Sequence, residues 1–195
     1  SVGSNNLRKS FARLNTGELG GFKTWVSASH TEGDKWKGKG TLRADKIEWN
    51  TLFEDGNGNS TNAIVKYNLQ ENYNYNSVSK SQFQTQGRRL DYSESTVFKN
   101  GSVSQSYKLN RNPFESVTAS VTQRFQLRDD LSLTFNPYYV WSNGGSFSGQ
   151  TATTLSSTSS RAGNYDLSGL PSGTYYRPSW TETWRPGMTT KLKWD

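Results

Sequence analysis

The residues best suited to binding a small molecule lie in two long polar stretches of this sequence. Arginine presents a planar fork that pairs with carboxylate or phosphate groups. Tyrosine and tryptophan present flat faces on which sugars or aromatic ligands can stack. We predict ligand contacts from Arg88, Arg89, Arg161, Tyr165, Asp166, Tyr176, Arg177 and Trp180. The competing interpretation is that these residues only hold their own stretches together.

Covalent catalysis has no suitable group of residues in this chain. His30 is the only histidine and cysteine is absent, so the usual nitrogen and sulfur ligands of a zinc site are not available. Asp129 and Asp130 could form a carboxylate pair, but adjacent residues in a short turn point apart into solvent. No GxSxG, HExxH or P-loop motif occurs. We therefore expect a protein that is not an enzyme, with no catalytic residue, metal or cofactor.

The elements that must position the two polar stretches are strands, and the clearest is a hairpin from Glu115 to Trp141. Side chains of a strand alternate between its two faces. Polar residues fill the positions between the apolar ones, and only residues 128–130 separate the two arms. Arms of about a dozen residues exceed the mean strand of about 5–6 residues, and a membrane would explain their length. The alternating apolar residues are Val117, Ala119, Val121, Phe125, Leu127, Leu131, Leu133, Phe135, Tyr139 and Trp141.

The same alternation predicts further strands over residues 22–30, 42–53, 61–73 and 188–195, and a less regular one over residues 7–14. Between them, connections at 15–21, 54–60 and 128–130 are short, while those at 31–40, 74–113 and 143–186 are longer. Short and long connections alternate without exception. In an up-and-down barrel every second connection lies on the same side of the membrane, and outer-membrane barrels have short periplasmic turns and longer outer loops.

Composition is consistent with this interpretation. Only 31% of residues are hydrophobic and the mean hydropathy is −0.87, which is poor for the core of a water-soluble domain. However, the 7 Trp, 10 Tyr and 9 Phe of the chain are too many for a disordered protein. A membrane barrel resolves the conflict, because its lumen and loops are polar and only alternate strand residues need be apolar. The basic residues behind the net charge of +7 are scattered, so we expect no nucleic-acid partner.

These observations predict an all-β fold, namely an antiparallel up-and-down transmembrane β-barrel segment. We expect about seven long strands, short periplasmic turns and long extracellular loops. No run of 18 apolar residues is present, so no transmembrane helix is expected. The chain starts at Ser1 without a methionine and stops at Asp195 within an expected strand, which we interpret as a fragment of a longer protein.

Several short segments of the sequence resemble barrel segments of TonB-dependent receptors, and together they span most of the chain. They are FARLNTGELG at 11–20, SASHT at 27–31, DKWKG at 34–38, LNRNPF at 109–114, RAGNYDLSGL at 161–170 and YYRPSWTETWRPG at 175–187.

The resemblance implies a 22-stranded barrel of the bacterial cell outer membrane with a plug domain inside it. Such receptors import a scarce ligand, such as a siderophore, vitamin or glycan, with energy relayed by TonB. Residues 1–195 would then be a partial β-barrel domain, and no plug or TonB box is recognisable in them. The expected partners are outer-membrane lipid and lipopolysaccharide, the receptor's own plug, the TonB energy-transducing complex and the ligand.

Two alternatives remain open at this stage. A soluble secreted β-sandwich that binds carbohydrate through exposed aromatic residues would bury its apolar faces between two layers. A passive porin-like channel would have the same wall and no plug. Trp25 shares the polar face of its strand with Lys23 and Ser27, so we expect it to contact the plug.

Overall fold

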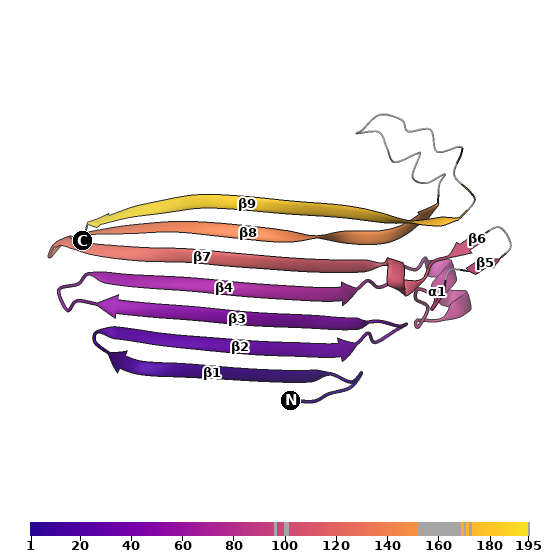
Figure 1. Cartoon of the computed structure of the whole chain (residues 1–195), viewed down its shortest axis with the longest axis horizontal. Coiled ribbons are helices and arrows are strands. Elements are labelled where there is room, and N and C mark those ends of the chain that lie inside the picture. Colours follow the sequence, from indigo (N-terminus) through magenta and orange to yellow (C-terminus); the bar gives the residue numbers. More distant parts are fainter. Residues whose placement is uncertain (96, 100–101, 152–168, 170, 172, 195) are drawn as a thin grey trace.

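The structure is a computed structural model, and it describes residues 1–95, 97–99, 102–151, 169, 171 and 173–194. Seven antiparallel strands lie side by side in a single layer (Figure 1), in the order β1-β2-β3-β4-β7-β8-β9. The sheet is open, with β1 and β9 at its edges. Its strands are β1 (Arg8–Leu19), β2 (Phe22–Asp34), β3 (Thr41–Glu54), β4 (Ser60–Tyr73), β7 (Arg111–Arg128), β8 (Leu131–Thr151) and β9 (Thr174–Trp194). The predicted all-β class and up-and-down order are confirmed.

The connections are sorted between the two ends of the sheet, as the sequence predicted. Tight turns join β1 to β2, β3 to β4 and β7 to β8 at one end, hereafter the turn end. The longer connections lie at the opposite end, hereafter the loop end, and include residues 35–40 and 74–110. The second of these carries α1 (Lys80–Gln86), β5 (Val97–Lys99), β6 (Ser102–Ser104) and the 3-10 helix η1 (Tyr107–Leu109).

The turn between β3 and β4 has a clear chemical basis. Asp55 Oδ1 accepts hydrogen bonds from the backbone N–H groups of Asn57 and Asn59, at 2.8 and 3.2 Å. Its Oδ2 accepts a third from the Asn59 side chain at 2.6 Å. Gly56 and Gly58 adopt φ values of 78° and 86°, which other residues reach only with strain. The Asn59 side chain, followed by the backbone N–H of Asn57, holds the pKa of Asp55 below its ordinary value.

The strand register places the predicted apolar residues on one face of the sheet, hereafter the apolar face. Trp49 pairs with Val26 and Val65, and Trp141 pairs with Val117 and Trp184. Side chains that share this face form a continuous band across all seven strands. Its large members are Leu14, Leu19, Phe22, Val26, Ile47, Trp49, Phe53, Val65, Tyr67, Leu69, Val117, Val121, Phe125, Leu131, Leu133, Phe135, Tyr139, Trp141, Trp184, Met188, Leu192 and Trp194.

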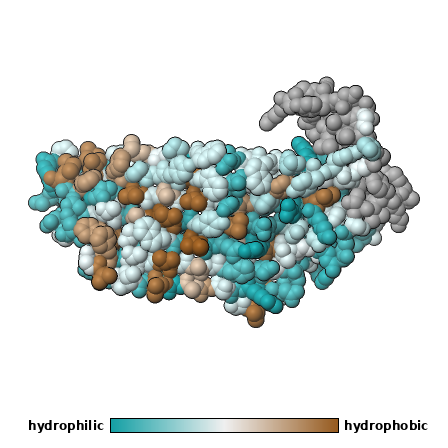
Figure 2. Space-filling model, in the orientation of Figure 1, coloured by the Kyte–Doolittle hydropathy of each residue, from teal (hydrophilic) through white to brown (hydrophobic). Residues whose placement is uncertain are grey.

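No second layer covers this band within the described part of the chain. Ile47 is 51% exposed and Met188 is 60% exposed, and among the described residues Phe147 is the sole buried hydrophobic side chain. Figure 2 shows hydrophobic side chains gathered over the strands, mainly in the half of the sheet away from α1. The sheet therefore presents its apolar side chains outward instead of enclosing them in a core.

The opposite face, hereafter the polar face, carries the intervening residues. Trp25 lies on it, because it pairs with Asn15 and Asn50. The prediction that Trp25 shares this face with Lys23 and Ser27 is therefore confirmed. Arg13 places its guanidinium 4.2 Å from the centre of the Trp25 ring.

Several predicted boundaries were wrong: β2 continues to Asp34 and β7 begins at Arg111, and the largest differences lie in two other regions. Residues 143–186 were predicted as one long connection, but β8 continues to Thr151 and β9 begins at Thr174. Residues 15–21 were predicted as a turn, but β1 continues to Leu19 through an irregularity between Asn15 and Glu18. In both regions Ser, Thr, Gly and Asn hide the alternation, while pairing with a neighbouring strand supplies the stability that local propensity lacks.

Candidate binding site at the loop end

A buried ion pair joins the two described loops of the loop end. Lys35 Nζ lies 2.6 Å from Asp91 Oδ2, and the two side chains are 0% and 1% exposed. Lys35 also donates a hydrogen bond to the Asn74 carbonyl at 2.7 Å. The Oδ2 atom has no aligned hydrogen-bond donor, so its contact with Lys35 is ionic. Asp91 Oδ1 accepts hydrogen bonds from the backbone N–H groups of Asn76 and Tyr92, at 2.7 and 2.9 Å.

Aromatic rings surround this ion pair. Lys35 Nζ lies 4.7 Å from the centre of the Tyr75 ring, and Trp36 packs against the same ring at 6.1 Å. Lys37 donates a hydrogen bond to the Asn76 carbonyl at 2.9 Å and is buried as well. Burial, and then the neighbouring Asp91 carboxylate, raise the pKa of Tyr92. The loop at 35–40 is therefore fixed to residues 74–92 by charge, hydrogen bonds and ring contacts together.

Gly38 allows the loop to make this close approach. Its φ of +68° lies in the left-handed region, and a Cβ at this position would lie 2.5 Å from Asp91 Oδ2. Any side chain here would therefore strain the backbone and also displace Asp91.

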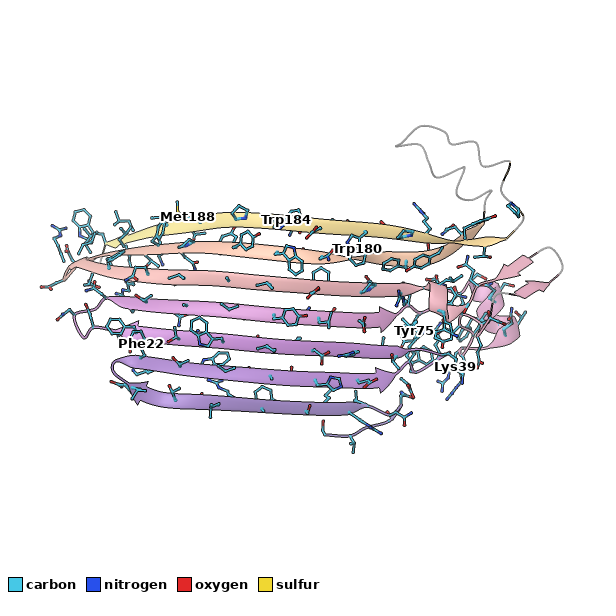
Figure 3. All side chains as sticks on the ribbon, in the orientation of Figure 1. Phe22, Lys39, Tyr75, Trp180, Trp184 and Met188 are labelled. Atoms are coloured by element: carbon cyan, nitrogen blue, oxygen red, sulfur yellow. The ribbon has the colours of Figure 1, made fainter. Side chains whose placement is uncertain are left out.

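A cavity of about 520 Å³ opens beside this loop. Trp36 lines it with a side chain that is 48% exposed. Lys39 and Arg89 supply positive charge, and Asp34, whose carboxylate accepts a hydrogen bond from the Asn6 side chain, supplies negative charge. Figure 3 shows Lys39 and Tyr75 together at the loop end, far from Phe22 at the turn end. We call this cavity the rim pocket; its lining is Asn5, Asn6, Asp34, Lys35, Trp36, Lys37, Gly38, Lys39, Gly40 and Arg89.

The helix before Arg89 has a well-formed start. Ser79 caps α1 by accepting a hydrogen bond from the Gln82 backbone, and the Gln82 side chain accepts one from the Ser79 backbone. The helix ends at Gly87, with φ of 80°. Arg88 and Arg89 follow directly and are exposed. Because a capped helix precedes them, their backbone starts from a defined position at the pocket border.

A second cluster lies on the β8–β9 hairpin. Tyr176 stacks on Phe147 with ring centres 5.2 Å apart and an angle of 4°, and Trp180 packs against Phe147 at 5.5 Å. The Arg111 guanidinium lies 5.6 Å from the Phe147 ring centre. Pairing places Tyr176 and Trp180 on the same face as Trp184, which is the apolar face.

The predicted ligand contacts are thus divided among separate places. Arg89 borders the rim pocket, whereas Arg88 is exposed and is not among the residues that line it. Tyr176 and Trp180 come together on Phe147, and Arg177 lies on the opposite face, where it pairs with Ser148. Arg161, Tyr165 and Asp166 lie outside the described residues. The role of all eight residues as ligand contacts stays a prediction.

Trp36, Lys37 and Lys39 line the pocket but were not predicted as ligand contacts. The phrase DKWKGKG at 34–40 carried a usable signal, because lysines alternate with a tryptophan and two glycines. Its contacts with residues 74–92 join positions far apart in the chain, which local spacing cannot indicate.

The residues considered for catalysis make ordinary surface contacts. His30 Nδ1 lies 2.5 Å from Asp45 Oδ1, and Asp130 pairs with Arg128 at 3.4 Å. Among the described residues, no group of three or more His, Cys, Asp or Glu side chains could hold a metal ion. In the same part of the chain, no helix has the length and apolar character needed to cross a membrane.

Comparison with protein-family models, curated proteins and solved structures finds no match for this chain.

Proposed function

We propose that this chain forms part of the wall of an outer-membrane β-barrel, in a TonB-dependent receptor that imports a scarce ligand such as a siderophore, vitamin or glycan. The observation that carries the proposal is the continuous apolar band on one face of a single-layer sheet. Contiguous apolar patches beyond a few hundred Å² are rare on soluble monomers. Covering a large apolar side chain gains about 1.5–3 kcal/mol, so a lipid environment favours this sheet strongly.

The dimensions of the band support a bilayer as its cover. On β8 it runs from Leu131 to Trp141. Ten residue steps of ~3.4 Å along a strand tilted by ~45° span roughly 24 Å along the membrane normal. This is close to the ~25 Å height of the apolar band of outer-membrane barrels. Aromatic rings stand at both borders of the band. Phe22 and Phe53 pack together at 4.9 Å near the turn end, and Trp184 lies toward the loop end, in agreement with the aromatic girdles of such barrels.

The open edges of the sheet favour a closed barrel. In lipid every backbone N–H and C=O needs a partner, and an open sheet edge leaves a row of them unpaired. The outward edges of β1 and β9 would therefore pair with further strands of the same wall. The soluble β-sandwich requires a second layer over the apolar face, and no described residue supplies one.

The loops, the wall and the plug of the proposed receptor have separate roles. Loops at the loop end bind the ligand from dilute solution, and the rim pocket is one surface for this step. The polar face of the wall surrounds a plug, which closes the pore until TonB supplies energy. No bond is made or broken in the ligand. The receptor assignment, as opposed to a passive porin, is supported by the resemblance of the sequence phrases to this family.

Membrane topology offers a direct test, because the chain has no cysteine. Single cysteines replace Lys39 at the loop end and Asn57 at the turn end, and intact cells are treated with a membrane-impermeant maleimide. We expect labelling at position 39 and none at position 57 until the outer membrane is opened. Equal labelling of both sites in intact cells would contradict the proposal.

A second experiment separates a receptor from a passive channel. Dissipation of the inner-membrane proton gradient should stop ligand uptake by a receptor and leave uptake through a passive channel unaffected.

A further inference from the structure

The charges of the seven paired strands are divided unevenly between the two faces of the sheet. The polar face carries the basic residues Lys9, Arg13, Lys23, Lys46, Lys66, Arg124, Arg177, Arg185, Lys191 and Lys193, against the acidic residues Glu18, Glu48 and Glu54. The apolar face, beyond the band, carries Arg8, Arg43, Arg111 and Arg128 against Glu32, Asp34, Asp45, Glu71, Glu115 and Glu182. The positive charge of the sheet is therefore concentrated on the polar face.

The acidic side chains of the polar face neutralise only a small part of this charge. Glu18 and Glu54 both pair with Lys23, at 3.9 and 3.0 Å, and Glu48 pairs with Lys66 at 3.8 Å. The excess is carried by exposed side chains, among them Arg13, Lys46, Arg124, Arg185 and Lys191. Two of these cations contact neutral groups, Trp25 for Arg13 and Gln126 for Arg124, and such contacts leave their charge in place.

The rim pocket also has an excess of positive charge, because Lys35, Lys37, Lys39 and Arg89 outnumber Asp34 in its lining. Lys39 is 65% exposed and its nearest carboxylate, Glu94, lies 3.3 Å away. Arg89 is exposed and stands at the same pocket. Trp36 lines the same pocket, and Lys37 Nζ lies 5.6 Å from the centre of its ring. A cleft with an excess of one sign of charge focuses the field and can raise the local concentration of an oppositely charged solute.

We propose that the solute taken up through this wall is an anion that carries carboxylate or phosphate groups. The inference rests on the proposed function and specifies the substrate class of the same site. Cations at the rim pocket bind the anionic groups, Trp36 covers a flat part of the solute, and the polar face keeps an attractive potential along the wall. A neutral solute would gain nothing from this distribution of charge, and a cation would be repelled by it.

The potential along the polar face can be measured with thiol reagents. A cysteine at position 118 lies beside Lys66 and Val140 on the polar face, and a cysteine at position 57 in a turn serves as reference. Rates are measured with sulfonate-bearing and trimethylammonium-bearing methanethiosulfonates, each normalised to a neutral methanethiosulfonate. We expect the anion-to-cation rate ratio at position 118 to exceed that at position 57 by about tenfold. Lys46→Gln and Arg185→Gln should lower the ratio, and Lys66→Arg should preserve it.

The outcomes separate the two levels of the proposal. A ratio at position 118 equal to or below the reference would overturn the anion class and leave the membrane wall intact. A thiol at position 118 that reacts with a lipid-soluble maleimide and not with the neutral water-soluble reagent would contradict a polar face turned away from lipid, and with it the proposed function on which the inference rests.

A second measurement addresses the rim pocket with defined probes. Inorganic pyrophosphate and citrate are titrated into the detergent-solubilised protein by calorimetry, with spermidine as the cationic probe. We expect binding of both anions, a loss of about tenfold in affinity in Lys39→Gln and in Arg89→Gln, and no change in the control variants Lys80→Gln and Lys108→Gln. Equal binding in all four variants, or tighter binding of spermidine, would overturn the assignment. Lipopolysaccharide is titrated in the same way. A pocket that binds the free anions and not lipopolysaccharide takes a soluble solute, as proposed. A pocket that binds lipopolysaccharide and not the free anions takes a lipid phosphate, which would overturn the assignment.

Discussion

Lys35 and Asp91 illustrate how strongly one pair of side chains can determine the shape of the loop end. Both are almost fully buried, and together they bind backbone groups of Asn74, Asn76 and Tyr92. A buried ion pair is costly to assemble, but removal of one partner is costlier, because the other charge is left without compensation. The pair therefore maintains the distance between the loop at 35–40 and the segment at 74–92.

We expect Lys35→Met to destabilise this contact by about 3–5 kcal/mol, since the Asp91 carboxylate remains buried without its partner. Amide hydrogen exchange over residues 35–40 and 74–92 should accelerate, while exchange in β3 and β4 stays slow. Lys39→Met is the matched control, because the Lys39–Glu94 pair is exposed and worth at most about 1 kcal/mol. Partial recovery in the double variant Lys35→Met/Asp91→Leu would support the mechanism, and equal exchange in Lys35→Met and Lys39→Met would refute it.

Gly38 and Gly17 form a natural comparison of strain with and without crowding. Their φ values are nearly equal, +68° and +69°, but a Cβ at Gly17 would meet no atom within 4 Å. Gly38→Ala should therefore lower the free energy of unfolding of the loop contact more than Gly17→Ala lowers that of β1, where only the backbone cost of about 1 kcal/mol applies. Thermal unfolding and hydrogen exchange measure both. A similar effect of the two substitutions would show that the Asp91 contact does not constrain Gly38.

At the scale of elements, alternation predicted which residues share a face. The pairings of Trp49 with Val26 and of Val117 with Trp141 agree with the predicted faces, and the alternating lengths of the connections agree with the two ends of the sheet. These features depend on the period of a strand, which is visible in local sequence.

The parts that escaped prediction depend on contacts between distant residues. The outer halves of β8 and β9 are stabilised by pairs such as Ser142 with Thr183, whose hydroxyl groups are 2.6 Å apart. Ser and Gly dominate the outer half of β8, and Arg177 and Pro178 interrupt that of β9, so neither half was predicted as a strand. The rim pocket escaped for the same reason, because Trp36 and Arg89 come from different connections. Tyr176 and Trp180 were predicted as ligand contacts in a loop, but their place on the apolar face follows only from the register of β9.

The β3–β4 turn should respond to acid. The pKa of Asp55 is below its ordinary value of 3.8, so ionisation of Asp55 stabilises the turn above that pH, and this contribution is lost as the pH falls through the lowered pKa. We expect hydrogen exchange at Gly56 and Gly58 to accelerate as the pH drops below about 4, after correction for the intrinsic pH dependence of exchange. Asp55→Asn should remove this dependence. A turn whose exchange is equally pH-independent in both proteins would contradict the role given to the carboxylate.

At the scale of the whole molecule, the two faces of the sheet should tolerate charge differently. Val65 belongs to the apolar band, and its neighbour Ile64 belongs to the polar face, where it pairs with Asn50. An arginine on the lipid face near the middle of a bilayer costs about 2–4 kcal/mol, whereas one in a lumen is tolerated. Val65→Arg should therefore reduce folded protein in outer membranes, and Ile64→Arg should not. Urea unfolding of the membrane-inserted protein provides the measurement, and equal destabilisation by both substitutions would argue against a lipid-facing band.

The most direct test of the membrane wall is the accessibility of its two faces to oxygen and to a water-soluble nickel chelate. Single cysteines carrying a nitroxide label are placed in turn at positions 117–127 and 131–141 of the membrane-inserted protein, and electron paramagnetic resonance reports collisions with each reagent. We predict a period of two residues, with oxygen favoured at positions such as 117, 119 and 133 and the nickel chelate favoured at 118, 120 and 134. Labels at the apolar positions that meet neither reagent, as between two packed protein layers, would contradict the account.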